Sequence, residues 1–192
     1  MTDSAANLPM LHPGLLLVAG GLLLFWLRGK ARQVATLALP LLALALVWQV
    51  PDGPSWQLRF LDHTLSPLQG DKLSRLFATI FSLMAAAGGL FALGQKSRLE
   101  VPAAFVYAGS AIGVALAGDL ITVFLFWELM AVGSTLVLWS QGSAASYAAA
   151  RRYLMIHLLG GVVLFAGVTG HVAETGSVAF TRMALDSPAH AL

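Results

Sequence analysis

Long apolar runs separated by short charged segments dominate this sequence. A membrane-spanning helix needs about 20 mostly apolar residues. Reading the runs between charges predicts six such helices, at about residues 8–27, 34–50, 75–93, 101–118, 120–139 and 153–172. The stretch from Pro51 to Ser74 opens with the turn signal Pro51-Asp52-Gly53-Pro54 and is too polar to span. We therefore predict an all-α integral membrane fold that forms a single membrane domain over residues 1–192.

Composition supports a membrane protein and excludes several other classes. Apolar residues make up 58% of the chain and charged residues only 10%, whereas soluble domains are about 25% charged. A net charge of +2 gives no electrostatic support for nucleic-acid binding. The absence of cysteine from the sequence excludes disulfides and cysteine-ligated zinc or iron–sulfur sites.

The distribution of basic residues predicts the orientation in the membrane. The connections after the first, third and fifth predicted helices hold seven basic residues and one acid, Glu100; the basic residues are Arg28, Lys30, Arg32, Lys96, Arg98, Arg151 and Arg152. Short cytoplasmic loops are enriched in Lys and Arg. This places both termini outside, in a multi-pass protein.

Small residues gather on one face of the fourth predicted helix. Gly109, Gly113 and Ala117 recur at every fourth position, which is typical of a close helix–helix contact. Small residues are also simply common in membrane helices, and the two interpretations are about equally supported by the sequence.

Glu128 is the residue that the bilayer tolerates least. It lies eight or nine residues from the start of the fifth predicted helix, which is roughly 12–13 Å into the membrane. A charged side chain at this depth is costly and marks ion pathways in many membrane proteins. It must face protein or water, and either find a cation or take a proton. The alternative is a structural glutamate fixed by a hydroxyl or backbone group.

His157, one turn into the sixth predicted helix, is a second candidate for handling protons, because histidine changes charge near neutral pH. It could equally be an interfacial residue bonded to a carbonyl. His157 and His171 are fourteen residues apart, a spacing that suits two haem ligands along one helix. Bis-histidine haem also needs ligands on a facing helix, and the spans offer none. We therefore expect no cofactor, no metal site and no catalytic residue.

The segment from Ala117 to Met130, with Asp119-Leu120 followed by Phe126-Trp127-Glu128-Leu129-Met130, resembles the fifth helix of antiporter-like membrane subunits. These subunits occur in Mrp sodium/proton antiporters, respiratory complex I and membrane-bound hydrogenases, and the D-type subunit of Mrp is the most similar. The chain can be laid on the first six helices of such a subunit, which has about fourteen. The specific match covers residues 117–139.

The resemblance implies that Glu128 is the family's proton-handling glutamate. In the family this residue pairs with a lysine on the seventh helix, which this sequence does not contain. The resemblance therefore implies partner membrane subunits, including a chain or segment that supplies the intramembrane lysines. It also implies protons as the transported ion, with sodium as a second candidate, and a bacterial inner membrane. We expect the front portion of an antiporter subunit, as a fragment or a split gene product.

Three functions are compatible with these observations. The first is ion translocation by an antiporter-like subunit of a multi-subunit complex, with Glu128 and His157 as the ion-handling residues. The second is a structural or assembly subunit that transports nothing. The third, a haem or quinone electron carrier, is disfavoured by the missing histidine pair. The sequence offers no chemistry for hydride or electron transfer, so any redox activity would belong to other subunits.

Overall fold

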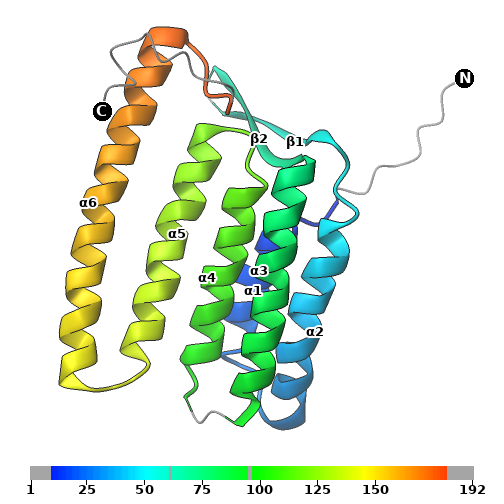
Figure 1. Cartoon of the computed structure of the whole chain (residues 1–192), viewed down its shortest axis with the longest axis vertical. Coiled ribbons are helices and arrows are strands. Elements are labelled where there is room, and N and C mark those ends of the chain that lie inside the picture. The colour runs from blue at the N-terminus through cyan, green and yellow to red at the C-terminus, as the bar shows by residue number, and fades with distance from the viewer. Residues whose placement is uncertain (1–9, 61, 95–96, 181–192) are drawn as a thin grey trace, which may run out of the picture.

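The computed structural model describes residues 10–60, 62–94 and 97–180. Within them the chain forms six α-helices, a short 3-10 helix and one antiparallel hairpin (Figure 1). The elements are α1 (Pro13–Leu23), α2 (Gly29–Val47), β1 (Gly53–Phe60), β2 (His63–Gly70), α3 (Lys72–Phe91), η1 (Ala92–Gly94), α4 (Glu100–Ala115), α5 (Leu120–Trp139) and α6 (Ala144–Thr175). The predicted helical membrane fold is confirmed, and the hairpin is added to it.

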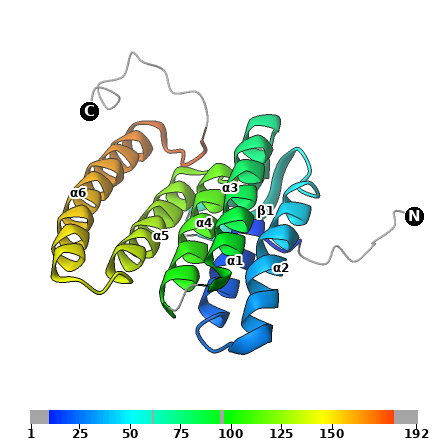
Figure 2. The same ribbon diagram turned by 60° about the horizontal axis from the view of Figure 1, so that its bottom comes forward.

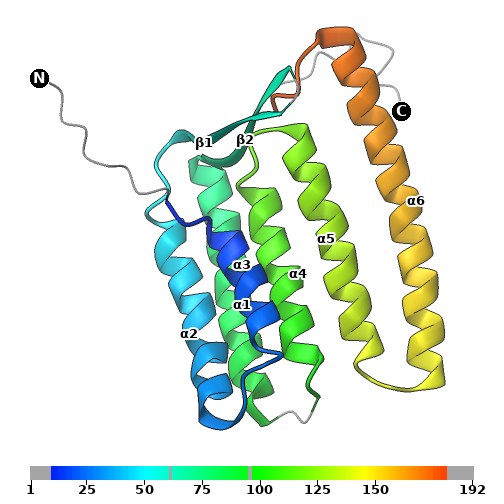
Figure 3. The same cartoon turned by 180° about the vertical axis from the view of Figure 1, so that it is seen from behind.

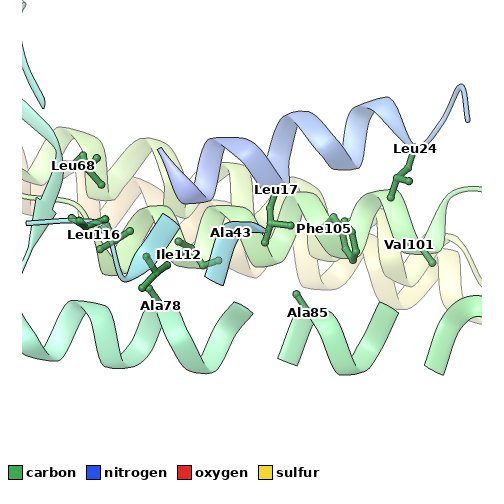
Figure 4. Packing of buried hydrophobic residues seen from close by; sticks show 12 residues of the cluster. Leu17, Leu24, Ala43, Leu68, Ala78, Ala85, Val101, Phe105, Ile112 and Leu116 are labelled. Carbon is green, nitrogen blue, oxygen red and sulfur yellow. The ribbon is translucent and has the colours of Figure 1, made fainter. Parts of the chain in front are cut away.

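The first four helices form a closed group. Helix α1 contacts α2 and α4, and α3 also contacts α2 and α4. Helix α5 then packs on α4, and α6 packs on α5 at the edge of the molecule (Figures 1 and 2). The hydrophobic core lies inside the group of four, where Leu17, Phe105 and Ile112 are fully or almost fully buried (Figure 4). Helix α6 is left largely exposed by the rest of the described chain.

Some of the helices differ in length from the predicted spans. Four helical segments are long and apolar enough to cross a membrane, namely α2, α3 with η1, α5 and α6. Helices α1 and α4 are shorter, with 11 and 16 residues. The predicted span 8–27 continued to Leu27, but the N–H groups of Phe25 and Trp26 bond to carbonyls three residues back and end α1 in a tight turn. Hydropathy detects the apolar run from residue 8 to residue 27, but it does not detect that the backbone hydrogen bonds change at Phe25 and Trp26.

Helix α6 is longer than the predicted 153–172. It begins at Ala144, because Ser143 and Ser146 form a reciprocal capping box that satisfies the first N–H groups. It ends at Gly176, whose φ of 68° lies in the left-handed region that favours glycine. Arg151 and Arg152 therefore lie inside the helix.

The polar stretch after α2 folds into the β1–β2 hairpin, an element that the sequence analysis left unassigned. Trp56, Leu58 and Phe60 alternate with Gln57 and Arg59, a period of two that is typical of a strand. The hairpin lies across one end of the helix group (Figure 3). It is tied there by backbone bonds from Gln69 N–H to the Leu116 carbonyl (2.7 Å) and from Gly118 N–H to the Ser66 carbonyl (2.9 Å).

The opposite end of the bundle collects the basic connections. The turns α1–α2, α3–α4 and α5–α6 all lie at the end away from the hairpin (Figures 1 and 3). Arg28 lies in the first of them and Lys30 follows it in the first turn of α2, Arg98 lies in the second, and Arg151 and Arg152 follow the third. Lys96 lies outside the described residues. This arrangement supports the predicted orientation, with the hairpin outside.

Helices α1 and α4 approach each other at Gly14 and Gly109, which agrees with the first of the two interpretations of the small residues in the fourth predicted helix. A Cβ added to Gly109 would lie 2.5 Å from the carbonyl oxygen of Gly14, and a Cβ added to Gly14 would lie 2.5 Å from that of Gly109. Backbone atoms cannot move aside as a flexible side chain can. Both positions therefore require the absence of a side chain.

The glycine contact predicts a large loss of stability for Gly109→Ala. The added methyl group forces α1 and α4 apart, and overpacking of this kind costs about 1–3 kcal/mol. Gly88→Ala in α3 is the control, because a Cβ there meets nothing within 4 Å and alanine is the better helix former by about 1 kcal/mol. Thermal unfolding of the purified protein should show a lower Tm for Gly109→Ala only. Equal Tm values for the two variants would contradict the contact.

His12 caps α1 and is fully buried beneath the hairpin. Its Nδ1 accepts the N–H groups of Gly14 (3.0 Å) and Leu15 (3.3 Å), and its Nε2 lies 3.1 Å from the Pro67 carbonyl. Since Nδ1 is an acceptor, the ring is neutral and carries its proton on Nε2. His12 precedes the first residue of α1, and its burial lowers its pKa below the ordinary value.

We therefore expect the protein to lose stability as the pH falls below about 6.5, the ordinary histidine value. The unfolded chain takes up the proton there, whereas folded His12 takes it up only at lower pH, so acid favours the unfolded chain. His12→Asn keeps a capping oxygen and does not titrate. Its Tm should be lower than that of the unmodified protein near neutral pH but should change less between about pH 7.5 and pH 5. An unchanged pH slope in His12→Asn would contradict the role of His12.

Candidate functional site

Glu128 lies near the middle of α5, the helix between α4 and α6. The helix begins at Asp119, whose side chain caps it by accepting the Thr122 N–H. The observed bounds of α5 are those predicted, so the depth argued for Glu128 applies to the structure. Helix position thus places one carboxyl group deep in the apolar part of the bundle.

The carboxyl group of Glu128 points at the backbone of α6. A Cβ added to Gly161 would overlap Oε1 of Glu128 and would lie 3.0 Å from its Cδ. Oε1 is buried and has no hydrogen-bond partner among the described residues. The structure thus provides neither a hydroxyl nor a backbone donor for Oε1, which the structural interpretation of this glutamate requires.

His157 lies on the same side of α6, one turn before Gly161. Its Nε2 is also buried, and within the described part of the chain it has no hydrogen-bond partner. The indole ring of Trp127 lies 5.5 Å from the imidazole and the ring of Tyr153 lies 5.8 Å from it, measured between centroids. Trp127 therefore packs against His157, while its neighbour Glu128 reaches past it to Gly161.

Further polar groups continue this strip toward the basic end of the bundle. The hydroxyl groups of Ser134 and Tyr153 are hydrogen-bonded to each other at 2.9 Å. We use the name α5–α6 seam for the strip formed by Glu128 and Ser134 of α5 with Tyr153, His157 and Gly161 of α6. Two of its side chains, Glu128 and His157, can exchange protons, and each holds one buried polar atom without a partner among the described residues. An unpartnered buried polar atom is costly and commonly marks a functional group or a missing partner.

Charge around Glu128 is sparse. An ion pair between Arg75 and Asp52, with a distance of 2.5 Å between Nη2 and Oδ1, lies at the hairpin end of the bundle. The described residues also hold no group of three or more His, Asp or Glu that could bind a metal ion. A cation for Glu128, such as the lysine that the resemblance implies, has to come from outside these residues.

The second histidine of the haem hypothesis lies far from the first. His171 is fourteen residues after His157 on α6, which is about 21 Å along the helix axis. Helix α5, which packs on α6, contains no histidine in its sequence. The seam therefore provides no facing ligands for a bis-histidine haem.

Asp119 is a structurally important residue whose role the sequence analysis did not assign. It is almost fully buried, and its carboxylate accepts the N–H groups of Thr122 (2.8 Å) and Ser66 (2.7 Å) and the Thr122 hydroxyl (2.7 Å). It thereby caps α5 and ties it to β2. An aspartate three residues before a threonine at the start of an apolar run is a capping signal that was available in the sequence.

Comparisons with known proteins agree with the motif in α5. Residues 117–190, which include Glu128, His157 and Gly161, match the family described as NADH:quinone oxidoreductase/Mrp antiporter, transmembrane. The Na(+)/H(+) antiporter subunit A1 of Staphylococcus aureus strain JH9 is 30% identical over 105 residues, and that of strain Newman matches equally. The match covers 51% of this chain and 13% of the relative. Particular similarity to the D-type subunit of Mrp is not confirmed.

The fold has a solved counterpart. The membrane-bound sulfane sulfur reductase, an archaeal respiratory membrane complex, contains a chain that superposes with a TM-score of 0.68 at 16% identity. The superposition covers 88% of this chain and 39% of the other. This likeness shows a shared fold, and the present chain spans less than half of the length of that chain. Residues 117–190 of this multi-pass chain are thus similar in sequence to the NADH:quinone oxidoreductase/Mrp antiporter family, and the chain shares its fold with a chain of a respiratory membrane complex.

Proposed function

We propose that this chain is an ion-translocating subunit of a multi-subunit membrane complex, with Glu128 as its intramembrane proton-handling group. The observation that carries the proposal is the Glu128 carboxyl group, which is directed at α6 with Oε1 buried and unbonded within the described chain. Burying a carboxylate without a partner is costly, so a carboxyl group in this setting needs either a proton or a nearby cation. An exchange between these two partners is the step that the proposal assigns to Glu128.

His157 is the second ion-handling residue in this proposal. It lies one turn from Gly161, on the side of the seam nearer to the basic connections, and its Nε2 has no partner among the described residues. Protons arriving from that side would meet the Ser134–Tyr153 pair, then His157 and then Glu128. The order follows from helix geometry, because residues 153, 157 and 161 recur at four-residue intervals on α6.

The missing cation defines the partner that the proposal requires. A proton path needs a group that can displace the proton from Glu128, and the resemblance assigns this role to lysines beyond the sixth helix. We propose that another chain or segment of the complex supplies them, facing the exposed side of α5 and α6. Protons are the transported ion in this proposal, sodium is the counter-ion that the name of the Staphylococcus aureus relatives suggests, and the bacterial inner membrane is the location.

The second candidate is a structural or assembly subunit that transports nothing. One observation favours it: among the described residues Glu128 is the one carboxyl group that lies in a candidate span away from the helix ends, and Lys30 and Lys72 lie in the first turns of α2 and α3. The two candidates differ in one experiment. Glu128→Gln removes the proton-binding group and should abolish ion exchange in native membranes if the chain translocates ions, and should leave exchange intact if the chain is structural.

A further inference from the structure

We propose that Gly161 is a positioning residue for Glu128: the space left by its missing side chain receives the carboxyl group and seats it against the α6 backbone. This inference rests on the proposed function of Glu128 and adds a residue to it. We call the space at Gly161 the carboxyl seat. A Cβ at this position would overlap Oε1 and would lie 3.0 Å from Cδ and 3.4 Å from Oε2 of Glu128.

The neighbouring glycines show that the seat is specific to one position. Gly160 and Gly167 lie in the same helix, and a Cβ added to either meets nothing within 4 Å. Gly161 is buried, whereas Gly160 is exposed. Glycine in the interior of a helix is unfavourable by about 1 kcal/mol relative to alanine. At Gly161 that cost has a structural reason, because the carboxyl group occupies the place of a side chain.

Ordinary backbone geometry strengthens this interpretation. Gly161 is inside a continuous α-helix and is absent from the glycines with positive φ, which among the described residues are Gly29, Gly53, Gly142 and Gly176. An alanine could adopt the backbone conformation of Gly161 without strain. The reason for glycine here is therefore the volume that Glu128 fills, and an alanine would force the end of the Glu128 side chain to move aside.

The carboxyl seat determines which atoms surround the Glu128 carboxyl group and at which turn of α6 this group lies. Packed against the α6 backbone, Oε1 is closed off and has no bond within the described chain. The same contact sets the height of the carboxyl group on α6, one turn from His157. Ionisable side chains of the two helices that pack on α5 are Glu100 and Tyr107 of α4 and Tyr147, Arg151, Arg152, Tyr153, His157, His171 and Glu174 of α6. Of the groups on α6, His157 lies one turn from the seat.

The functional test compares two adjacent substitutions in native membranes. Gly161→Ala puts a methyl group in the seat and moves Oε1 of Glu128 by about 1 Å or more, a misplacement that can cost on the order of 100-fold in rate. We expect ion exchange to fall at least about tenfold in Gly161→Ala. Gly160→Ala makes the same chemical change one residue away and should stay within about twofold of the unmodified protein. Equal rates in the two variants would overturn the proposal.

A stability measurement keeps the proposal testable even if Gly161→Ala assembles poorly. Protein purified together with its accompanying subunits is compared with and without the Glu128→Ala substitution. In the presence of Glu128, Gly161→Ala should give a lower Tm than Gly160→Ala, because the carboxyl group has to leave the seat. In the Glu128→Ala background the seat is empty, and Gly161→Ala should leave Tm unchanged or raise it, because alanine favours the helix. Gly160→Ala should have the same sign in both backgrounds. A Gly161→Ala effect that does not depend on Glu128 would overturn the seat.

The exchange measurement and the Tm measurement together separate this inference from the proposed function. If Glu128→Gln is inactive while Gly161→Ala matches Gly160→Ala in exchange rate and in Tm, Glu128 handles protons without the seat and the positioning role is wrong. If Glu128→Gln transports normally, the proposed function fails, and with it the positioning role of Gly161. The dependence of the Gly161→Ala effect on Glu128 would then describe a packing contact only.

Discussion

Exchange of protons for cations across native membranes is expected to fall to the background level when Glu128 is replaced by glutamine. Glutamine has nearly the same volume and shape as glutamate, so it can occupy the seat at Gly161. It cannot bind and release a proton at any pH near neutral. The rate is therefore expected to fall by several orders of magnitude while the amount of assembled protein stays the same. The measurement is the cation-induced change of the proton gradient in everted membrane vesicles.

Two comparisons make the result interpretable. Glu100→Gln changes the same residue type at the first residue of α4, outside the seam, and should exchange ions at nearly the unmodified rate. The level of the subunit and of the proteins that purify with it should be equal in both variants. Normal exchange in Glu128→Gln would show that the carboxyl group is not part of the proton path, and the structural interpretation of the chain would then stand.

The helical part of the fold could be predicted because the bilayer forces a simple pattern on the sequence. Apolar runs of about 20 residues have to be helical, since backbone groups find no other partners in lipid. The predicted bounds of residues 120–139 are those of α5. The end of α1 and the start of α6 depend on hydrogen bonds at Trp26 and Ser143. Such local bonds leave little trace in hydropathy.

The hairpin carries a strand signal that hydropathy does not reveal. The alternation from Trp56 to Phe60 is short and lies in a stretch that hydropathy marks only as too polar to span. The role of the hairpin could not be predicted from local sequence at all. Trp56 Nε1 donates to the Met10 carbonyl (2.9 Å), and the fully buried Leu68 joins the core of the helix group. These contacts join residues more than 40 positions apart.

The candidate site also has one part that the sequence predicts and one part that only the packed structure shows. Glu128 could be found from the sequence because its cost in a membrane depends only on its depth in a helix. Its position against Gly161 depends on how α5 and α6 are aligned, and two helices joined by a short turn can still pack with several alignments. The pairing of a carboxyl group with a specific glycine is therefore a property of the packed structure. The same holds for Trp127, whose contact with His157 comes from the facing helix.

The largest loss of stability is expected from replacing Asp119 with alanine. Its carboxylate serves three donors on two elements, Ser66 N–H in β2 and the N–H and hydroxyl of Thr122 in α5. Loss of a helix cap costs about 1 kcal/mol, and each buried donor left unpaired costs about 1–3 kcal/mol. The cap and the unpaired Ser66 N–H together give a decrease of about 2–4 kcal/mol in the free energy of unfolding, and the unpaired Thr122 hydroxyl adds to it. Thermal unfolding should show the decrease, and hydrogen exchange should become faster at the Ser66 amide.

A second capping aspartate provides the matched control. Asp71 caps α3 by accepting the N–H groups of Leu73 (2.7 Å) and Ser74 (2.8 Å), but it is exposed and its side chain bonds only to its own helix. Asp71→Ala should therefore cost about 1 kcal/mol.

Asp119→Asn should fall between the two alanine variants. Its amide oxygen can still cap Thr122, while its NH2 group faces the Ser66 N–H, which then has no acceptor. The comparison separates the cap of α5 from the bond to the hairpin, because Asp119→Asn keeps the cap and loses only the hydrogen bond from the Ser66 N–H. If Asp119→Ala and Asp71→Ala cost the same, the hairpin is held by its backbone bonds alone, and Asp119 acts only as a cap.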